Sequence, residues 1–146
     1  MRVTPAIFIF SFAVVLIACG KDKFETKPRL EIKDYSSKFV DIGQNLRIRL
    51  NYYDKEGDLG GAAIIGFKDR LNLFPPGRDL VDTFRVTLPE FPEEDQGEIS
   101  FELGHDRLNE SAIENDTIVF RFAVTDIAGN KSDTITSDQI VVQFKP

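Results

Sequence analysis

Three carboxylates spaced two residues apart stand in a glycine-rich stretch near the middle of the chain: Asp54, Glu56 and Asp58. Hard cations such as Ca²⁺ take six to eight oxygen ligands, mostly from carboxylates and backbone carbonyls, and glycine lets a chain wrap around the ion. The spacing is not that of an EF-hand. Counted from Asp54, the sixth residue is Leu59 and the twelfth is Ile65, where that loop needs glycine and glutamate.

A second set of oxygen donors lies much further along the chain, at Asp126 and Asn130. In a two-layer β-sandwich the loop after an early strand and the last hairpin can lie at the same end, so Asp126 or Asn130 could complete a Ca²⁺ site with Asp54, Glu56 and Asp58. The alternative needs no ion. Asp54 and Asp58 cap their own turns through side-chain hydrogen bonds, with glycines at the positive φ angles, and Asp126 and Asn130 do the same.

Residues for catalysis are scarce. The chain has one histidine, His105, and one cysteine, and it contains no nucleophile elbow, zinc-protease helix or phosphate-binding loop. The carboxylates between Glu90 and Glu98 could serve a glycosidase in principle, but Pro89, Pro92 and a run of adjacent acids predict a solvated loop instead. We therefore expect a non-catalytic protein in which His105 is an exposed or locally hydrogen-bonded loop residue.

Hydrophobic periodicity predicts β-structure throughout. Apolar and polar residues alternate over 46–53 and 118–125, as in strands with one face on a core, which places Phe120 and Phe122 inside and Arg121 outside. Only 106–115 suggests a helical turn. About seven short strands with frequent turns predict an all-β fold, an immunoglobulin-like β-sandwich. The weaker strand candidates are Arg29–Ile32, Ala63–Phe67, Thr83–Leu88, Glu98–Leu103 and Thr134–Phe144.

Two motifs support this fold by resemblance. The stretch from Val124 to Ser132, Val-Thr-Asp-Ile-Ala-Gly-Asn-Lys-Ser, resembles the last hairpin of bacterial immunoglobulin-like domains. The stretch from Asn51 to Gly60 resembles a turn found in small lipoproteins of Bacteroidota. The resemblance implies an immunoglobulin-like domain over residues 29–146, and neither motif implies a particular function.

The N-terminus resembles a bacterial lipoprotein signal peptide. Arg2 and the apolar run that follows lead to Leu16-Ile17-Ala18-Cys19, which resembles a lipobox, and the run is shorter than the ~20 residues that a spanning helix needs. The resemblance implies removal of residues 1–18 and acylation of Cys19, the only cysteine. Residues 19–28 are polar and end in proline. They read as a tether that spans at most about 3.5 Å per residue, or roughly 30 Å.

The net charge of the chain limits the classes of partner that we expect it to bind. With 18 basic and 24 acidic side chains the net charge is −6, which argues against nucleic acid and against electrostatic adsorption to anionic lipid. We expect contact with the membrane through the lipid on Cys19, an unidentified protein or glycan partner, and no cofactor apart from the Ca²⁺ hypothesis. The alternatives are a calcium-stabilised adhesion or glycan-contact domain and an accessory subunit of an envelope enzyme or transport complex.

The location follows from the same resemblance. Gly20, not aspartate, follows Cys19, so retention in the inner membrane is not signalled. The neighbouring Lys21-Asp22-Lys23 is loosely similar to surface-export signals of Bacteroidota. We expect the outer membrane, with the periplasmic face and the cell surface both open. Asp-Thr-Ile occurs twice and resembles the Bacteroidota O-glycosylation pattern at Thr117 and Thr134, although β-propensity alone also explains threonine there.

Overall fold

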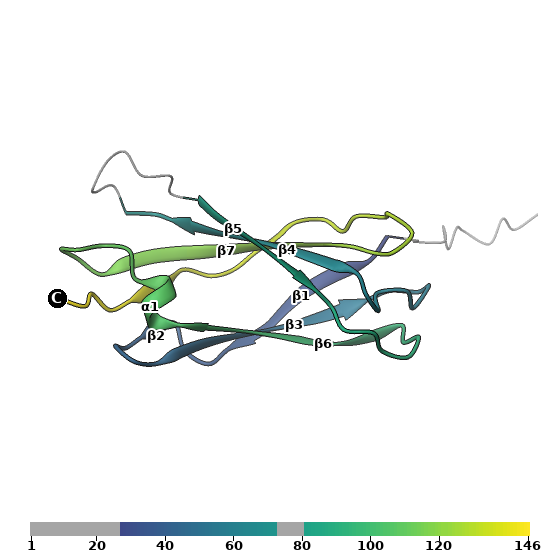
Figure 1. Ribbon diagram of the computed structural model, residues 1–146, viewed down its shortest axis with the longest axis horizontal. Helices are drawn as coiled ribbons and strands as arrows, with labels where there is room; N and C mark the ends of the chain where they lie inside the picture. Colours follow the sequence, from purple (N-terminus) through teal and green to yellow (C-terminus); the bar gives the residue numbers. More distant parts are fainter. Residues whose placement is uncertain (1–26, 73–80) are drawn as a thin grey trace, which may run out of the picture.

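A computed structural model describes residues 27–72 and 81–146, which form two packed β-sheets (Figure 1). The smaller sheet has the strand order β1-β3-β6, and the larger has the order β2-β9-β7-β4-β5 with β8 also paired to β7. The elements are β1 (Arg29–Tyr35), β2 (Phe39–Val40), β3 (Asn45–Tyr53), β4 (Ala63–Arg70), β5 (Val81–Thr87), β6 (Gln96–Gly104), α1 (His105–Leu108), β7 (Asp116–Thr125), β8 (Ile135–Thr136) and β9 (Ile140–Val142).

The topology confirms the predicted immunoglobulin-like sandwich. Strands β1, β3 and β6 occupy the places of A, B and E in that fold, and β4, β7 and β9 occupy those of C, F and G. Strand β5 extends the second sheet beside β4. Among the described strands every pairing is antiparallel except that of β2 with β9, which is parallel.

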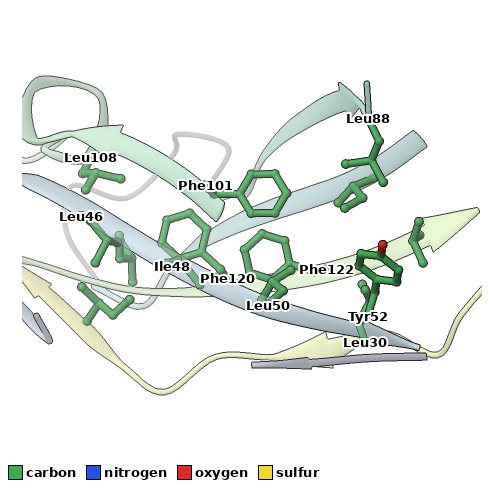
Figure 2. Close-up of a cluster of buried hydrophobic side chains, with 14 of the residues drawn as sticks. Leu30, Leu46, Ile48, Leu50, Tyr52, Leu88, Phe101, Leu108, Phe120 and Phe122 are labelled. Atoms are coloured by element: carbon green, nitrogen blue, oxygen red, sulfur yellow. The ribbon is translucent and has the colours of Figure 1, made fainter. Parts of the chain in front are cut away.

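The core lies between the inner faces of β3 and β7. The predicted alternation is correct on β3 and on most of β7: Phe120 and Phe122 are fully buried, while the Arg121 side chain is 40% exposed. It fails at Ala123, which the pattern placed outside and which is buried. Figure 2 shows the rings of Phe101, Phe120 and Phe122 together in the core. The Phe101 and Phe122 rings stack with their centroids 5.2 Å apart. Aromatic rings therefore fill much of the space between the sheets.

The aromatic core also explains one glycine. Gly66 on β4 lies opposite Phe84 on β5, and the Phe84 ring folds back across it. A Cβ atom at position 66 would lie 2.1 Å from a carbon of that ring. Glycine is needed here because the ring occupies the space that any side chain would take.

Three details differ from the sequence predictions. The expected strand Thr134–Phe144 is broken into β8 and β9, and Ser137 fills the break: its Oγ accepts the Phe120 N–H at 2.8 Å. Between Thr136 and Ile140 this segment has one residue more than the facing part of β7, as in a bulge. The helical turn covers only His105–Leu108. Strand β2 has two residues, too short for periodicity to reveal.

The sandwich has two distinct ends (Figure 1). At one end, here called the Lys27 end, lie the start of the described chain and the loops β3–β4, β5–β6 and β7–β8. At the other, the far end, lie the β2–β3 turn, α1, the loop that precedes β7 and the C-terminus. An ion pair of 2.5 Å between Lys27 and Asp133 joins the first described residue to the β7–β8 loop.

Candidate functional site

The β3–β4 loop begins with a turn built around Asp54. Its Oδ2 accepts the backbone N–H of Asp58 at 2.9 Å, and its carbonyl accepts the N–H of Gly57 at 3.1 Å. Gly57 has a φ of +68°, a conformation that suits glycine. The turn-capping interpretation is therefore correct for this half of the Asp54 carboxylate. It leaves the other oxygen, Oδ1, to be accounted for.

The β7–β8 loop contains a matching turn around Asp126. Its Oδ1 accepts the backbone N–H of Asn130 at 2.7 Å, and its Oδ2 accepts the Asn130 side-chain N–H at 2.9 Å. Gly129, with a φ of +94°, closes the turn through an N–H bond to the Asp126 carbonyl at 3.2 Å. The Asn130 amide thus holds the Asp126 carboxylate in one orientation. This makes Asn130 a positioning residue for Asp126.

The two loops meet at the Lys27 end. One carboxylate oxygen each from Glu56, Asp58 and Asp126 lies within 4.8 Å of the other two. Asp54 sits directly behind Asp58, to which it is joined by the hydrogen bond described above. We call Asp54, Glu56, Asp58 and Asp126 the acidic cluster. The structure thus brings together four of the five residues selected from sequence, with Asn130 behind Asp126.

The acidic cluster is short of partners. The side chains of Asp54 and Asp126 are nearly inaccessible, at 2% and 5% exposure, and the Oδ1 atoms of Asp54 and Asp58 are buried without a hydrogen-bond partner. Burial, followed by the negative charges of Asp126 and Asp54, raises the pKa of Asp58. Within residues 27–72 and 81–146 no ion pair to any of the four carboxylates is found.

Sequence reasoning missed a second buried polar cluster, at the far end. Asp116 is completely buried and forms an ion pair with Arg70. Its Oδ2 accepts the backbone N–H groups of Glu110 and Ser111 at 2.6 and 2.8 Å and the Asn109 side chain at 3.1 Å. Burial alone would raise the pKa of Asp116, but these hydrogen bonds and Arg70 outweigh it and lower the pKa. The sequence did offer one sign of this cluster. Arg70 and Asp116 are charged residues at positions where the strand pattern places side chains in the core.

His105 is buried, not exposed. It opens α1 with 2% of its surface accessible, and its Nε2 lies 2.6 Å from the Gln143 carbonyl, far along the chain. The ring therefore ties α1 to the C-terminal segment. A ring that is buried in this way has no access to a substrate in solvent, so its position favours a structural role over acid–base chemistry.

The remaining predicted sites divide by position. Cys19 lies outside the described residues. Thr117 is half-buried within β7, and its N–H donates to Asn72 Oδ1 at 2.7 Å, whereas Thr134 is exposed in the loop before β8. Among the described residues, no helix combines the length and the apolar character that crossing a membrane requires.

A groove lies between the edge strands of the two sheets, β5 and β6. Phe84, Phe101 and Phe120 form its apolar floor, and the buried ammonium of Lys68 lies at its side, paired with Glu110. Next to it Tyr52, Leu88 and Phe91 line a second depression at the Lys27 end.

No family model and no curated protein sequence matches this chain. Among solved structures the chain is similar to the sporulation control protein Spo0M from Bacillus subtilis, with a TM-score of 0.49 and 12% identity over 82% of this chain and 51% of that one. It is also similar to a β-glucosidase from Listeria innocua, with a TM-score of 0.45 and 14% identity over 80% of this chain and 16% of the enzyme.

A superoxide reductase (neelaredoxin) from Ignicoccus hospitalis gives a TM-score of 0.41 at 8% identity, over 86% of this chain and 87% of the reductase. The chain thus spans about half of Spo0M and a sixth of the glucosidase. Likenesses this distant carry no information on activity, so the functional argument rests on the residues themselves.

Proposed function

We propose that this chain is a lipoprotein of the outer membrane, anchored through an acylated Cys19, whose sandwich is a non-catalytic binding or structural module. The observation that carries the proposal is Leu16-Ile17-Ala18-Cys19 behind a short apolar run, with the only cysteine of the chain at the acylation position. Two or more acyl chains, at about 0.8 kcal/mol per buried CH₂, anchor a protein stably.

The fold supports a defined orientation for such an anchored domain. The described chain starts at the Lys27 end, and residues 19–28 reach at most about 3.5 Å each, roughly 30 Å in all. The tether is therefore attached at the Lys27 end, and we propose that this end lies nearer the membrane while the far end points away from it. In this arrangement the acidic cluster lies near the lipid, while α1 and the C-terminus are presented to partners.

The distribution of exposed apolar side chains agrees with a partner-binding far end. Phe39, Ile42, Leu71 and Ile113 are all exposed and all belong to far-end segments. On the Lys27 side the exposed large apolar side chains among the described residues are Val86 near the end of β5 and Ile127 in the β7–β8 loop. Exposed apolar groups that gather in one region of a surface are typical of interaction sites.

A non-catalytic role is supported by the state of the polar groups. His105 is buried against Gln143, and the buried carboxylate of Asp116 is fully hydrogen-bonded to Arg70 and backbone N–H groups. Neither group is available to a substrate. The acidic cluster is the exception, and it favours the calcium-stabilised variant of this module.

The anchor is tested by Cys19→Ser. Cells that express the wild-type chain and are fed an alkyne fatty acid should yield a labelled, membrane-bound protein of processed length. The variant should be unlabelled and should keep residues 1–18. A serine variant that still incorporates fatty acid and sediments with membranes would refute the anchor.

The orientation is tested with a matched pair of isoleucines. Ile113 at the far end is 71% exposed and Ile127 at the Lys27 end is 67% exposed. A photo-crosslinking amino acid at position 113 should form protein adducts, and one at position 127 should form lipid adducts. The reverse pattern would contradict the proposed orientation without touching the anchor.

A further inference from the structure

The strongest unexplained feature of the molecule is a pair of buried carboxylate oxygens in one turn that have no hydrogen-bond partner. Asp54 Oδ1 and Asp58 Oδ1 are both buried and both lack a hydrogen-bond partner, although Asp54 is only 2% exposed. An ionised carboxylate has no proton to donate, so two such groups in contact satisfy neither oxygen. Burying charged oxygens without a partner is unfavourable, and folded proteins avoid it.

Two species could relieve this repulsion, a proton or a cation. A single proton shared between Asp54 and Asp58 would satisfy that pair. It would leave the other two members of the acidic cluster, Glu56 and Asp126, beside them without a counter-charge. Because three loop carboxylates converge on Asp58 from two separate loops, a cation that contacts several oxygens at once balances the charge more completely than one proton does.

We propose that the acidic cluster is a binding site for a divalent cation of the Ca²⁺ type, with Glu56, Asp58 and Asp126 as the converging ligands and the buried Asp54 carboxylate supporting Asp58 from behind. Asn130 holds Asp126 in place. The inference does not depend on lipid anchoring of the chain.

The donor set selects the ion. The cluster offers only carboxylate oxygens, with no histidine or cysteine in it, which suits Ca²⁺ or Mg²⁺ and not zinc or copper. Ca²⁺ accepts irregular sets of carboxylate ligands, whereas Mg²⁺ demands near-ideal octahedral geometry and gives up its water reluctantly. A set of three carboxylates from two loops therefore favours Ca²⁺ over Mg²⁺.

The position of the site gives the ion a structural role. Asp54, Glu56 and Asp58 follow β3 of the smaller sheet, while Asp126 follows β7 of the larger one. A bound ion therefore links the two sheets at the Lys27 end, where the chain has no disulfide to do so. Because the ion binds only the folded chain, it raises the unfolding temperature.

The test uses the full chain purified in detergent, stripped of metal and melted in buffers of equal ionic strength at pH 7.5. A hundredfold excess of Ca²⁺ over its dissociation constant should raise the melting temperature by on the order of 10 °C. Mg²⁺ should give a much smaller shift. Titration calorimetry should show one Ca²⁺ per chain.

Isosteric variants separate a metal site from a protonated cluster. Asp58→Asn and Asp126→Asn should each reduce the Ca²⁺ shift to less than half. Glu93→Gln, which neutralises an exposed acid in the adjacent β5–β6 loop, should keep it. Metal-free Asp58→Asn should melt no lower than metal-free wild type, because one of the repelling charges is gone.

Two results would overturn the inference. Identical melting curves in millimolar Ca²⁺ and in chelator would assign the cluster to a shared proton. If Asp58→Asn and Glu93→Gln reduced the Ca²⁺-induced shift in melting temperature equally, the ion would act through general charge screening and not through a site. Neither result bears on acylation of Cys19, which is measured by fatty-acid labelling.

Discussion

The two ends of the sandwich treat buried carboxylates in opposite ways. At the far end Asp116 has a guanidinium and three N–H donors around it, and its pKa is lowered. At the Lys27 end Asp54 and Asp58 bury oxygens with no donor, and the pKa of Asp58 is raised. The first arrangement is complete within the chain. The second lacks partners for its buried oxygens unless a ligand is bound. We therefore assign a structural role to Asp116 and a binding role to the acidic cluster.

The largest expected effect comes from breaking the complete cluster. Asp116→Ala should destabilise the fold by about 3–5 kcal/mol, because it removes the buried ion pair with Arg70 and leaves the N–H groups of Glu110 and Ser111 without their acceptor. The measurement is urea denaturation followed by circular dichroism. The double variant Arg70→Met with Asp116→Leu should recover part of the loss, since an apolar pair of similar size replaces the ions. A loss under about 1 kcal/mol in the single variant would remove the contrast between the two ends.

The next largest effect is expected in the pH dependence of stability. The contributions of Asp116 and Asp58 to the free energy of unfolding change with pH in opposite directions. The lowered pKa of Asp116 gives stability that is present above the usual aspartate pKa and is lost as the pH falls through its folded value. The raised pKa of Asp58 gives stability that is present at acid pH and is lost as the pH rises through its folded value. Metal-free protein should therefore be most stable in the mildly acidic range.

Denaturation curves between pH 3 and pH 8 check this prediction. Asp58→Asn should remove the loss of stability that occurs as the pH rises to neutral. It should leave unchanged the loss of stability that occurs at acid pH. Saturating Ca²⁺ should also remove the loss on the neutral side in the wild type. A wild-type protein without metal that is most stable at pH 8 would show that the acidic cluster is not a source of strain.

The smallest effect is expected from the residue behind the cluster. Asn130→Ala removes the side-chain hydrogen bond to Asp126 and keeps the backbone one, so it should cost about 0.5–1.5 kcal/mol. If Asn130 positions Asp126, Ca²⁺ affinity should also fall, although Asn130 is not proposed as a ligand. Asn130→Leu, which also removes the donor and adds no charge to the cluster, should resemble the alanine variant in calorimetry. Unchanged affinity in both would restrict Asn130 to the turn.

Much of the fold was predictable because neighbouring residues of a β-strand alternate between the core face and the solvent face, and this alternation is visible in the sequence. Period-two alternation placed Phe120 and Phe122 inside and Arg121 outside, as the structure confirms. Turn chemistry likewise placed Asp54 and Asp126 in loops. The break at Ser137 and the two-residue β2 were not predictable, because each depends on pairing with a distant strand and carries no periodic signal of its own.

For the candidate site, the sequence predicted which residues are neighbours along the chain, and the tertiary structure decided which are neighbours in space. Sequence alone determined that Asp54, Glu56 and Asp58 share a glycine-rich turn, since their spacing is local. Only the tertiary structure decided that Asp126 joins them, that Asn130 stands behind it, and that the oxygens between Asp54 and Asp58 have no partner. The physical reason is that burial and charge repulsion depend on how the two sheets close on each other. The same closure placed Arg70 against Asp116, two residues 46 positions apart with β5, β6 and α1 between them, which no local pattern could have matched.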